Sequence, residues 1–149
     1  LLAFNAHTLQ HGVDDARFAA LWLEWAERFD RPLAAWARAD SGRWAVAAKA
    51  ARPRCKVLRD GRDVIAFALA GEPPAYDAKA FDKSVAKGEP RGAEILRDLS
   101  AVLAGVPAWE ATAIESAIHG FAEARGLGLG KVAPPVCVAV TGGPVSPPL

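Results

Sequence analysis

The chain has 149 residues, of which 52% are hydrophobic and 23% are charged, the ordinary composition of a globular protein with a real core. Its formal net charge of +1 does not indicate a strongly basic nucleic-acid-binding protein, so any RNA contact must rest on local patches. No apolar run approaches the roughly 18 residues of a membrane span, and the start lacks the pattern of a secretory signal. We therefore expect a cytoplasmic protein without a membrane partner. Its two cysteines, Cys55 and Cys137, are too few for a disulfide framework and should be reduced.

Apolar residues recur at three- and four-residue spacing, and alternating strand-like runs are almost absent, which predicts an all-α fold. Residues 1–10 are compatible with a short helix that ends at Gly12. A second helix is predicted to run from an N-cap at Asp14 to Phe29, with an apolar stripe along one face. The stripe consists of Phe18, Leu21, Trp22 and Trp25.

Prolines and glycines divide the next forty residues. Pro32 fits the first position of a helix after Asp30, and Ser41-Gly42 is expected to close that helix. A further helix begins near residue 43 or 44 and is interrupted at Pro53, because proline lacks an amide donor and crowds the preceding turn. The helix expected to start there is weakened in its middle by Gly61. Its inward-facing side chains are Val57, Ile65, Phe67 and Leu69.

The clearest linker is the run 71–76, because its glycine and two prolines cannot continue a helix. Glycine and proline stops after it predict helices at 78–87, 93–103 and 109–125. We therefore expect a first helical subdomain at 1–70, a linker at 71–77 and a second helical subdomain at 78–149. The chain starts with Leu1 rather than Met, and we expect a piece of a longer protein, truncated at the C-terminal end of its second subdomain.

Two candidate reactive sites have simpler explanations. His7 and His11 are four residues apart, which is the spacing of a metal-binding pair, but no third or fourth ligand is evident near them. Cys55 lies among arginine and lysine neighbours that could lower its pKa and create a nucleophile. A nucleophile also needs a base, and none is readable nearby. We therefore favour surface imidazoles and a packed thiol, and we predict no metal.

A basic cluster occupies residues 52–63, where five cations face two acids. Such a cluster can bind phosphates or the edge of a base, and the alternative is a solvated helix face. The cations are Arg52, Arg54, Lys56, Arg59 and Arg62. The five tryptophans could stack on bases, but the apolar stripe favours the core for at least Trp22 and Trp25.

Three stretches resemble one family in the correct order and spacing. Residues 1–7 (LLAFNAH), 52–58 (RPRCKVL) and 127–142 (LGLGKVAPPVCVAVTG), the last followed by Ser146-Pro147, are similar to the anticodon-binding region of bacterial glutamyl-tRNA synthetases, which are class I aminoacyl-tRNA synthetases. The resemblance covers essentially the whole chain. It implies an all-α cage of two subdomains that grips the anticodon loop of the glutamate tRNA.

The resemblance also implies which residues contact tRNA. The arginine at the Arg54 position reads the third anticodon base, and Ser146 and Pro147 match the pair that contacts the first base. Arg52, Lys56 and Cys137 are the other tRNA-binding candidates, and lysines or arginines would hold the RNA backbone. The ATP-binding motifs of the catalytic domain are absent from this sequence, so ATP and Mg²⁺ would belong to that domain, and this chain alone should have no cofactor and no ligase activity. The implied partners are tRNA and the protein's own catalytic domain. DNA is not implied, and a monomer is expected.

The departures from the family pattern leave a second interpretation open. Where the family has the arginine that reads the middle anticodon base, this chain has Cys137, and the family's glutamine and leucine are Pro134 and Val136. A thiol cannot make the charged, bidentate contact of a guanidinium. The alternative is therefore a synthetase-derived helical module with weak or no tRNA binding that acts in protein–protein interaction. Whether the parent enzyme also charges the glutamine tRNA stays open.

Overall fold

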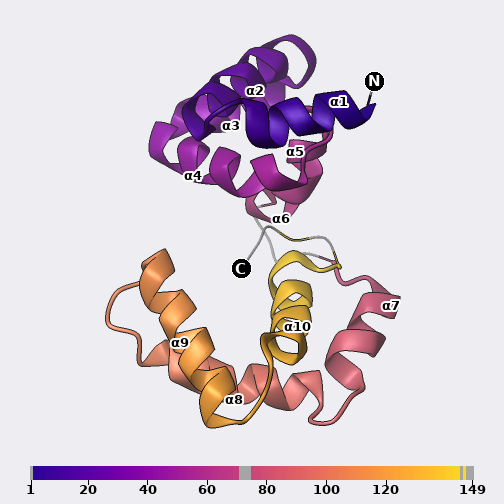
Figure 1. Ribbon diagram of the computed structural model, residues 1–149, viewed down its shortest axis with the longest axis vertical. Helices are drawn as coiled ribbons and strands as arrows, with labels where there is room; N and C mark the ends of the chain where they lie inside the picture. The colour runs from indigo at the N-terminus through magenta and orange to yellow at the C-terminus, as the bar shows by residue number, and fades with distance from the viewer. Residues whose placement is uncertain (1, 71–74, 145, 147–149) are drawn as a thin grey trace. The chain divides into compact units, whose positions relative to one another are not determined.

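The computed structural model describes residues 2–70, 75–144 and 146 of the chain. All regular structure in these residues is helical and none of them forms a strand, which confirms the expected all-α fold. The described residues form two compact units, which we call unit 1 (2–70) and unit 2 (75–144) (Figure 1). Most of the predicted linker, residues 71–74, lies outside the described residues. None of the helices in the described part combines the length and the apolar character needed to cross a membrane.

Three consecutive helices of unit 1 are capped by aspartates. Asp14, Asp30 and Asp40 each accept a hydrogen bond from the backbone amide three residues on, at 2.7, 3.2 and 2.9 Å. Such caps satisfy amides that have no partner inside the helix. The elements are α1 (Leu2–His7), a π-helical turn (Thr8–Gly12), α2 (Asp15–Phe29), α3 (Arg31–Ala39) and α4 (Ser41–Ala51).

The core of unit 1 is aromatic. Phe18 and Trp22 of α2 are completely buried, and the Trp22 ring stacks on that of Trp44 from α4 at 4.4 Å between centroids. The Trp44 indole donates a hydrogen bond to the carbonyl of Ala19 at 3.1 Å. Trp25 is half-buried against this core. The expected core role of Trp22 is therefore confirmed, whereas Trp25 lies at its margin.

Two expectations about unit 1 are wrong. Ser41-Gly42 begins α4 instead of closing α3, because Asp40 serves as the N-cap. The single helix expected from Pro53 onward is broken: a short 3-10 turn (Arg52–Arg54) is followed by an irregular bend and by α5 (Asp60–Val64) and α6 (Ala66–Leu69). The bend forms because the Asp60 carboxylate accepts hydrogen bonds from the amides of residues 56 and 57, at 2.9 and 3.0 Å. These contacts divert the backbone from a helical ladder.

Unit 2 is built around its last helix. Its elements are α7 (Ala78–Phe81) with a π-helical turn (Asp82–Ala86), α8 (Gly92–Ala104), α9 (Ala111–Ala124) and α10 (Leu129–Thr141). Helix α10 contacts all the others and lies between α7 and α9 in Figure 1. The buried core joins Ile95 and Leu99 of α8 to Ile118 and Phe121 of α9 and Val132 of α10.

Helix α10 is the element that the sequence pattern did not predict. Pro134 and Pro135 lie inside it, and each proline removes an amide donor that a helix interior normally uses. Burial compensates for this loss, because Val132, Val136 and Val138 are all buried on the side that meets the rest of unit 2. Tertiary packing therefore maintains a helix that local propensity opposes.

Candidate functional site

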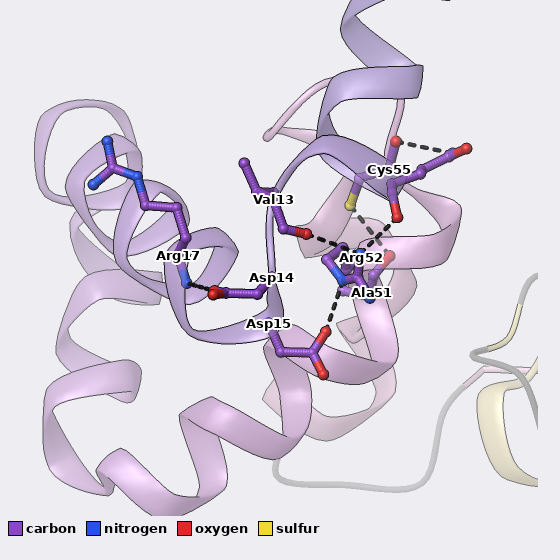
Figure 2. A network of polar contacts seen from close by, with 8 residues as sticks. Val13, Asp14, Asp15, Arg17, Ala51, Arg52 and Cys55 are labelled. Atoms are coloured by element: carbon purple, nitrogen blue, oxygen red, sulfur yellow. Dashed lines mark hydrogen bonds and ion pairs between the residues drawn. The ribbon is translucent and has the colours of Figure 1, made fainter.

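The bend after α4, residues 52–60, carries three of the predicted tRNA-binding residues, and Arg52 fixes it from the inside. The Arg52 side chain is only 22% exposed. Its Nε donates to the Asp15 carboxylate at 2.7 Å, and its Nη1 donates to the carbonyls of Gln10 and Val13 at 2.6 and 3.1 Å (Figure 2). Arg52 therefore fastens the bend to the start of α2. An RNA contact by this residue remains a prediction.

Cys55 fixes the same bend from beneath. Its side chain is completely buried, and its Sγ donates to the carbonyl of Ala51 at 3.3 Å (Figure 2). Burial, followed by the negative charge of Asp60, raises the pKa of the Cys55 thiol from 9.0 to about 12. The basic neighbours therefore do not activate this thiol. It is a packed, protonated side chain, as the simpler interpretation expected.

Polar side chains from α1 and its following turn complete the support. Asn5 Nδ2 donates to the carbonyl of Lys56 at 3.3 Å, and Gln10 Nε2 donates to the carbonyl of Cys55 at 3.1 Å. Together with the Asp60 contacts to the amides of the bend, these bonds leave few of its backbone groups dependent on water. The bend is therefore preorganised.

The basic cluster contains two kinds of cation: committed cations, which form ion pairs within the protein, and available cations, which do not. Arg52 pairs with Asp15 and Arg62 with Asp30. The other three, Arg54, Lys56 and Arg59, are exposed, and no ion pair is found for them among the residues that the structure describes. The preorganised bend thus presents three cations to solvent, which is an arrangement suited to phosphates and base edges.

The other predicted site residues do not belong to this bend. Cys137 is half-buried on α10 between the buried Val136 and Val138, and its carbonyl accepts a hydrogen bond from the Thr141 hydroxyl at 2.8 Å. Ser146 is half-buried. Pro147 lies outside the described residues. The structure therefore brings together Arg52, Arg54 and Lys56, and it places Cys137 in unit 2.

The histidine pair and one further group of cations remain to be placed. The rings of His7 and His11 are 5.3 Å apart, and within the described residues no group of three metal-ligating side chains forms around them. In unit 2, Lys83, Lys87 and Lys131 line one hollow, and the sequence analysis did not predict this group. Lys83 and Lys87 are four residues apart on a predicted helix, and this spacing could have indicated that they share one face.

Comparison with known proteins identifies the family. A family model described as an anticodon binding domain matches residues 17–149 of the chain. The chain belongs to the anticodon-binding domain family. The resemblance to the C-terminal region of glutamyl-tRNA synthetases is thereby confirmed.

Individual relatives agree with this membership of the anticodon-binding domain family. Glutamate–tRNA ligase 2 of Rhodospirillum centenum is 37% identical over 146 residues, which cover 97% of this chain and 30% of that protein. Glutamate–tRNA ligase 2 of Brucella ovis is 35% identical over 149 residues, covering 99% of this chain and 31% of that protein. Glutamate–tRNA ligase of an Anaeromyxobacter strain is 44% identical over 97 residues, or 65% of this chain and 19% of that protein. The chain thus spans less than a third of the length of these relatives.

Proposed function

We propose that this anticodon-binding domain recognises the anticodon loop of the glutamate tRNA on behalf of a glutamate–tRNA ligase. The ATP-dependent aminoacylation would be carried out by a catalytic domain that this sequence does not include. The observation that supports the proposal best is Arg54, which is exposed and lacks an ion-pair partner within the described part of the chain. It stands on a bend that the rest of unit 1 holds in place.

The chemistry of Arg54 fits the reading of a splayed base. A guanidinium presents its donors in a planar fork, which matches two acceptors on one base edge. The guanidinium discriminates between bases only if the backbone that carries it is fixed, because a mobile arginine adapts to any acceptor. Buried Cys55 and half-buried Arg52 fix the backbone on either side of Arg54. Lys56 and Arg59 are then available for the phosphates that flank the base.

The remaining predicted contacts belong to the same proposal. Ser146 and Pro147 would contact the first anticodon base. Cys137 stands where a charged reader of the middle base would be expected, and its half-buried thiol is too short and neutral to replace one. The domain should therefore read the middle base weakly.

A second candidate function is protein–protein interaction, and one surface of unit 1 favours it. A groove of about 790 Å³ has apolar side chains from the turn after α1, from the end of α2 and from the bend, beside the polar side chains of Asn5, Asp30, Arg59 and Arg62. The apolar side chains include Leu9, Trp25, Phe29 and Leu58, and Phe29 is 72% exposed. Exposed apolar surface of this kind is common at interaction sites.

Stem-loop binding separates the two candidates. We expect the chain to bind the anticodon stem-loop of the glutamate tRNA and to reject a stem-loop with an altered third anticodon base. Arg54→Gln should reduce that discrimination by about 1–3 kcal/mol, a scale taken from base readout in DNA. Lys49→Gln, which alters an exposed cation on α4, is the matched control and should leave it unchanged. Equal discrimination by the wild type and Arg54→Gln would exclude Arg54 from the site, and no stem-loop binding at all would favour the protein-interaction function.

A further inference from the structure

Unit 2 contains a small hollow that the proposed function has not used. It has a volume of about 230 Å³ and lies where the π-helical turn after α7 meets the starts of α8 and α10. Three lysines line it, Lys83, Lys87 and Lys131, and the acid among its lining residues is Glu89. The hollow is therefore cationic.

The lysines differ in how firmly they are held. Lys131 Nζ donates to the carbonyl of Glu89 at 3.2 Å, and Lys87 pairs with Asp82. Lys83 is exposed, and the described residues offer it no ion-pair partner. All three side chains are exposed, so their ammonium groups can turn toward an anion at little cost in desolvation. An anion at this place would meet cations from two separate elements.

The wall of the hollow is apolar and rigid. Pro134 of α10 contributes an exposed ring, whereas Pro135 of α10 and Ile95 of α8, which also line the hollow, are buried. The Pro134 ring has almost no conformational freedom to lose when a ligand packs on it. Gly92 also lines the hollow, and there the chain runs so close to its neighbour that a Cβ would lie 1.9 Å from the carbonyl oxygen of Ser84. The wall is therefore fixed, while the lysine side chains that line the hollow are exposed.

An exposed proline ring beside exposed lysines matches the two parts of a nucleotide. A base or ribose can pack on the Pro134 ring, and the phosphate can bind the ammonium groups. An acidic peptide would use the lysines but would leave the wall without a planar partner. The observations therefore favour a nucleotide over an acidic protein segment.

We propose that this hollow binds one nucleotide of the unpaired loop of the tRNA, with its phosphate on Lys83, Lys87 and Lys131 and its sugar or base against the exposed ring of Pro134. The inference rests on the proposed function and adds to it a contact that positions the RNA backbone. Such a contact carries no sequence information of its own. The contact would restore part of the tRNA affinity that is lost because Cys137 replaces a charged residue.

The test uses the whole chain and the glutamate anticodon stem-loop, with binding measured at several salt concentrations. The double variant Lys83→Ala/Lys131→Ala is compared with a control that also removes two exposed lysines, Lys49→Ala/Lys79→Ala. For each phosphate that the variant no longer neutralises, the slope of log K against log salt should fall by about 0.7, which is about fivefold in affinity at 0.1 M salt. The control should keep the wild-type slope, and discrimination between stem-loops with different anticodon bases should be the same in all three proteins.

The outcomes distinguish failure of the inference from failure of the proposed function. If the wild type binds the stem-loop and both double variants lose affinity equally, the lysines act only through net charge and the hollow is not a site. An effect of Lys83→Ala/Lys131→Ala on binding of poly-glutamate but not of the stem-loop would overturn the inference in favour of an acidic protein partner. No binding of the stem-loop by the wild type would overturn the proposed function and this inference with it.

Discussion

The two units of the chain present their cations in different ways. In unit 1, Arg54 stands on a bend whose backbone is fixed by buried Cys55 and by the hydrogen bonds of Arg52. In unit 2, the exposed side chains of Lys83 and Lys131 line a hollow together with the rigid, exposed ring of Pro134. A base edge requires a donor in a fixed position, whereas a phosphate accepts a mobile ammonium. On the proposed function, this difference predicts that the bend reads a base and that the hollow binds the RNA backbone.

The units also differ in what lies against their most crowded glycines. A Cβ on Gly92 would meet backbone, at 1.9 Å from the carbonyl oxygen of Ser84 and 2.8 Å from the Cα of Val85. Backbone at that distance cannot move without disturbing the turn that forms the hollow. We therefore expect Gly92→Ala to destabilise unit 2 by about 3 kcal/mol or more, at the upper end of overpacking effects. Hydrogen exchange of the α8 and α10 amides measures the effect.

A glycine in the same unit is the control. Nothing lies within 4 Å of a Cβ placed on Gly120, in the exposed middle of α9. Gly120→Ala should stabilise the helix by about 1 kcal/mol, because alanine loses less backbone freedom on folding. Faster exchange in unit 2 for both variants would show that close approach at Gly92 is not the cause.

The corresponding change in unit 1 meets a side chain. A Cβ on Gly61 would lie 2.5 Å from the Trp22 ring, which is completely buried and stacked on Trp44. The ring has little room to turn, so Gly61→Ala should cost about 2 kcal/mol in unit 1. Tryptophan fluorescence during urea unfolding measures it, because the one tryptophan of unit 2, Trp109, is 71% exposed. A urea midpoint of Gly61→Ala equal to that of the wild type would show that the Trp22 ring can move aside.

Alkaline pH tests whether the bend is as well packed as its contacts indicate. The pKa of Cys55 is about 12 in the folded chain, so unfolding releases a proton once the pH exceeds the ordinary thiol value. The contribution of Cys55 to stability is complete below pH 9 and falls by about 1.4 kcal/mol for each pH unit between 9 and 12. Urea unfolding at pH 7, 9 and 10 should show this slope as the difference between the wild type and Cys55→Ala. Parallel pH profiles for the two proteins would mean that the thiol is hydrated.

The smallest expected effect concerns Cys137. Its side chain is half-buried, so an arginine there could extend its guanidinium toward solvent. Cys137→Arg should raise stem-loop affinity and sharpen discrimination at the middle base, by about 1 kcal/mol at the low end of base-readout effects. Binding and thermal unfolding should be measured together. A sharply lower melting temperature would show instead that the position is a packing site that buries an unpaired charge.

Local sequence rules predicted the beginnings of the helices better than their continuity. Asp14 is the N-cap of α2, as its position indicated, because a cap depends on residues three apart, and α3 begins directly after Asp30. The helix expected after Pro53 failed because Asp60 hydrogen bonds to the amides before it. Helix α10 was missed because burial of Val132 and Val136 outweighs two prolines, and such burial depends on partners far away in the sequence.

In the candidate site, too, local features could be predicted from the sequence and long-range contacts could not. The basic cluster at residues 52–63 was visible in the sequence, but its separation into committed and available cations was not. Arg52 finds its partners 37 to 42 residues away, and Arg62 finds Asp30 32 residues away. The hollow of unit 2 joins Lys83 to Lys131 across a similar span. Long-range contacts of this kind leave no local pattern to read.

Recognition of the anticodon loop is the central claim, and one binding measurement tests it directly. The chain should be titrated at 0.1 M salt with the glutamate anticodon stem-loop and with a stem-loop of the same stem and loop length in which all three anticodon bases are changed. We expect the altered loop to bind more weakly by about 1–3 kcal/mol for each base that is read, with the smallest contribution from the middle base. Equal binding of the two stem-loops, or no binding of either, would contradict the account.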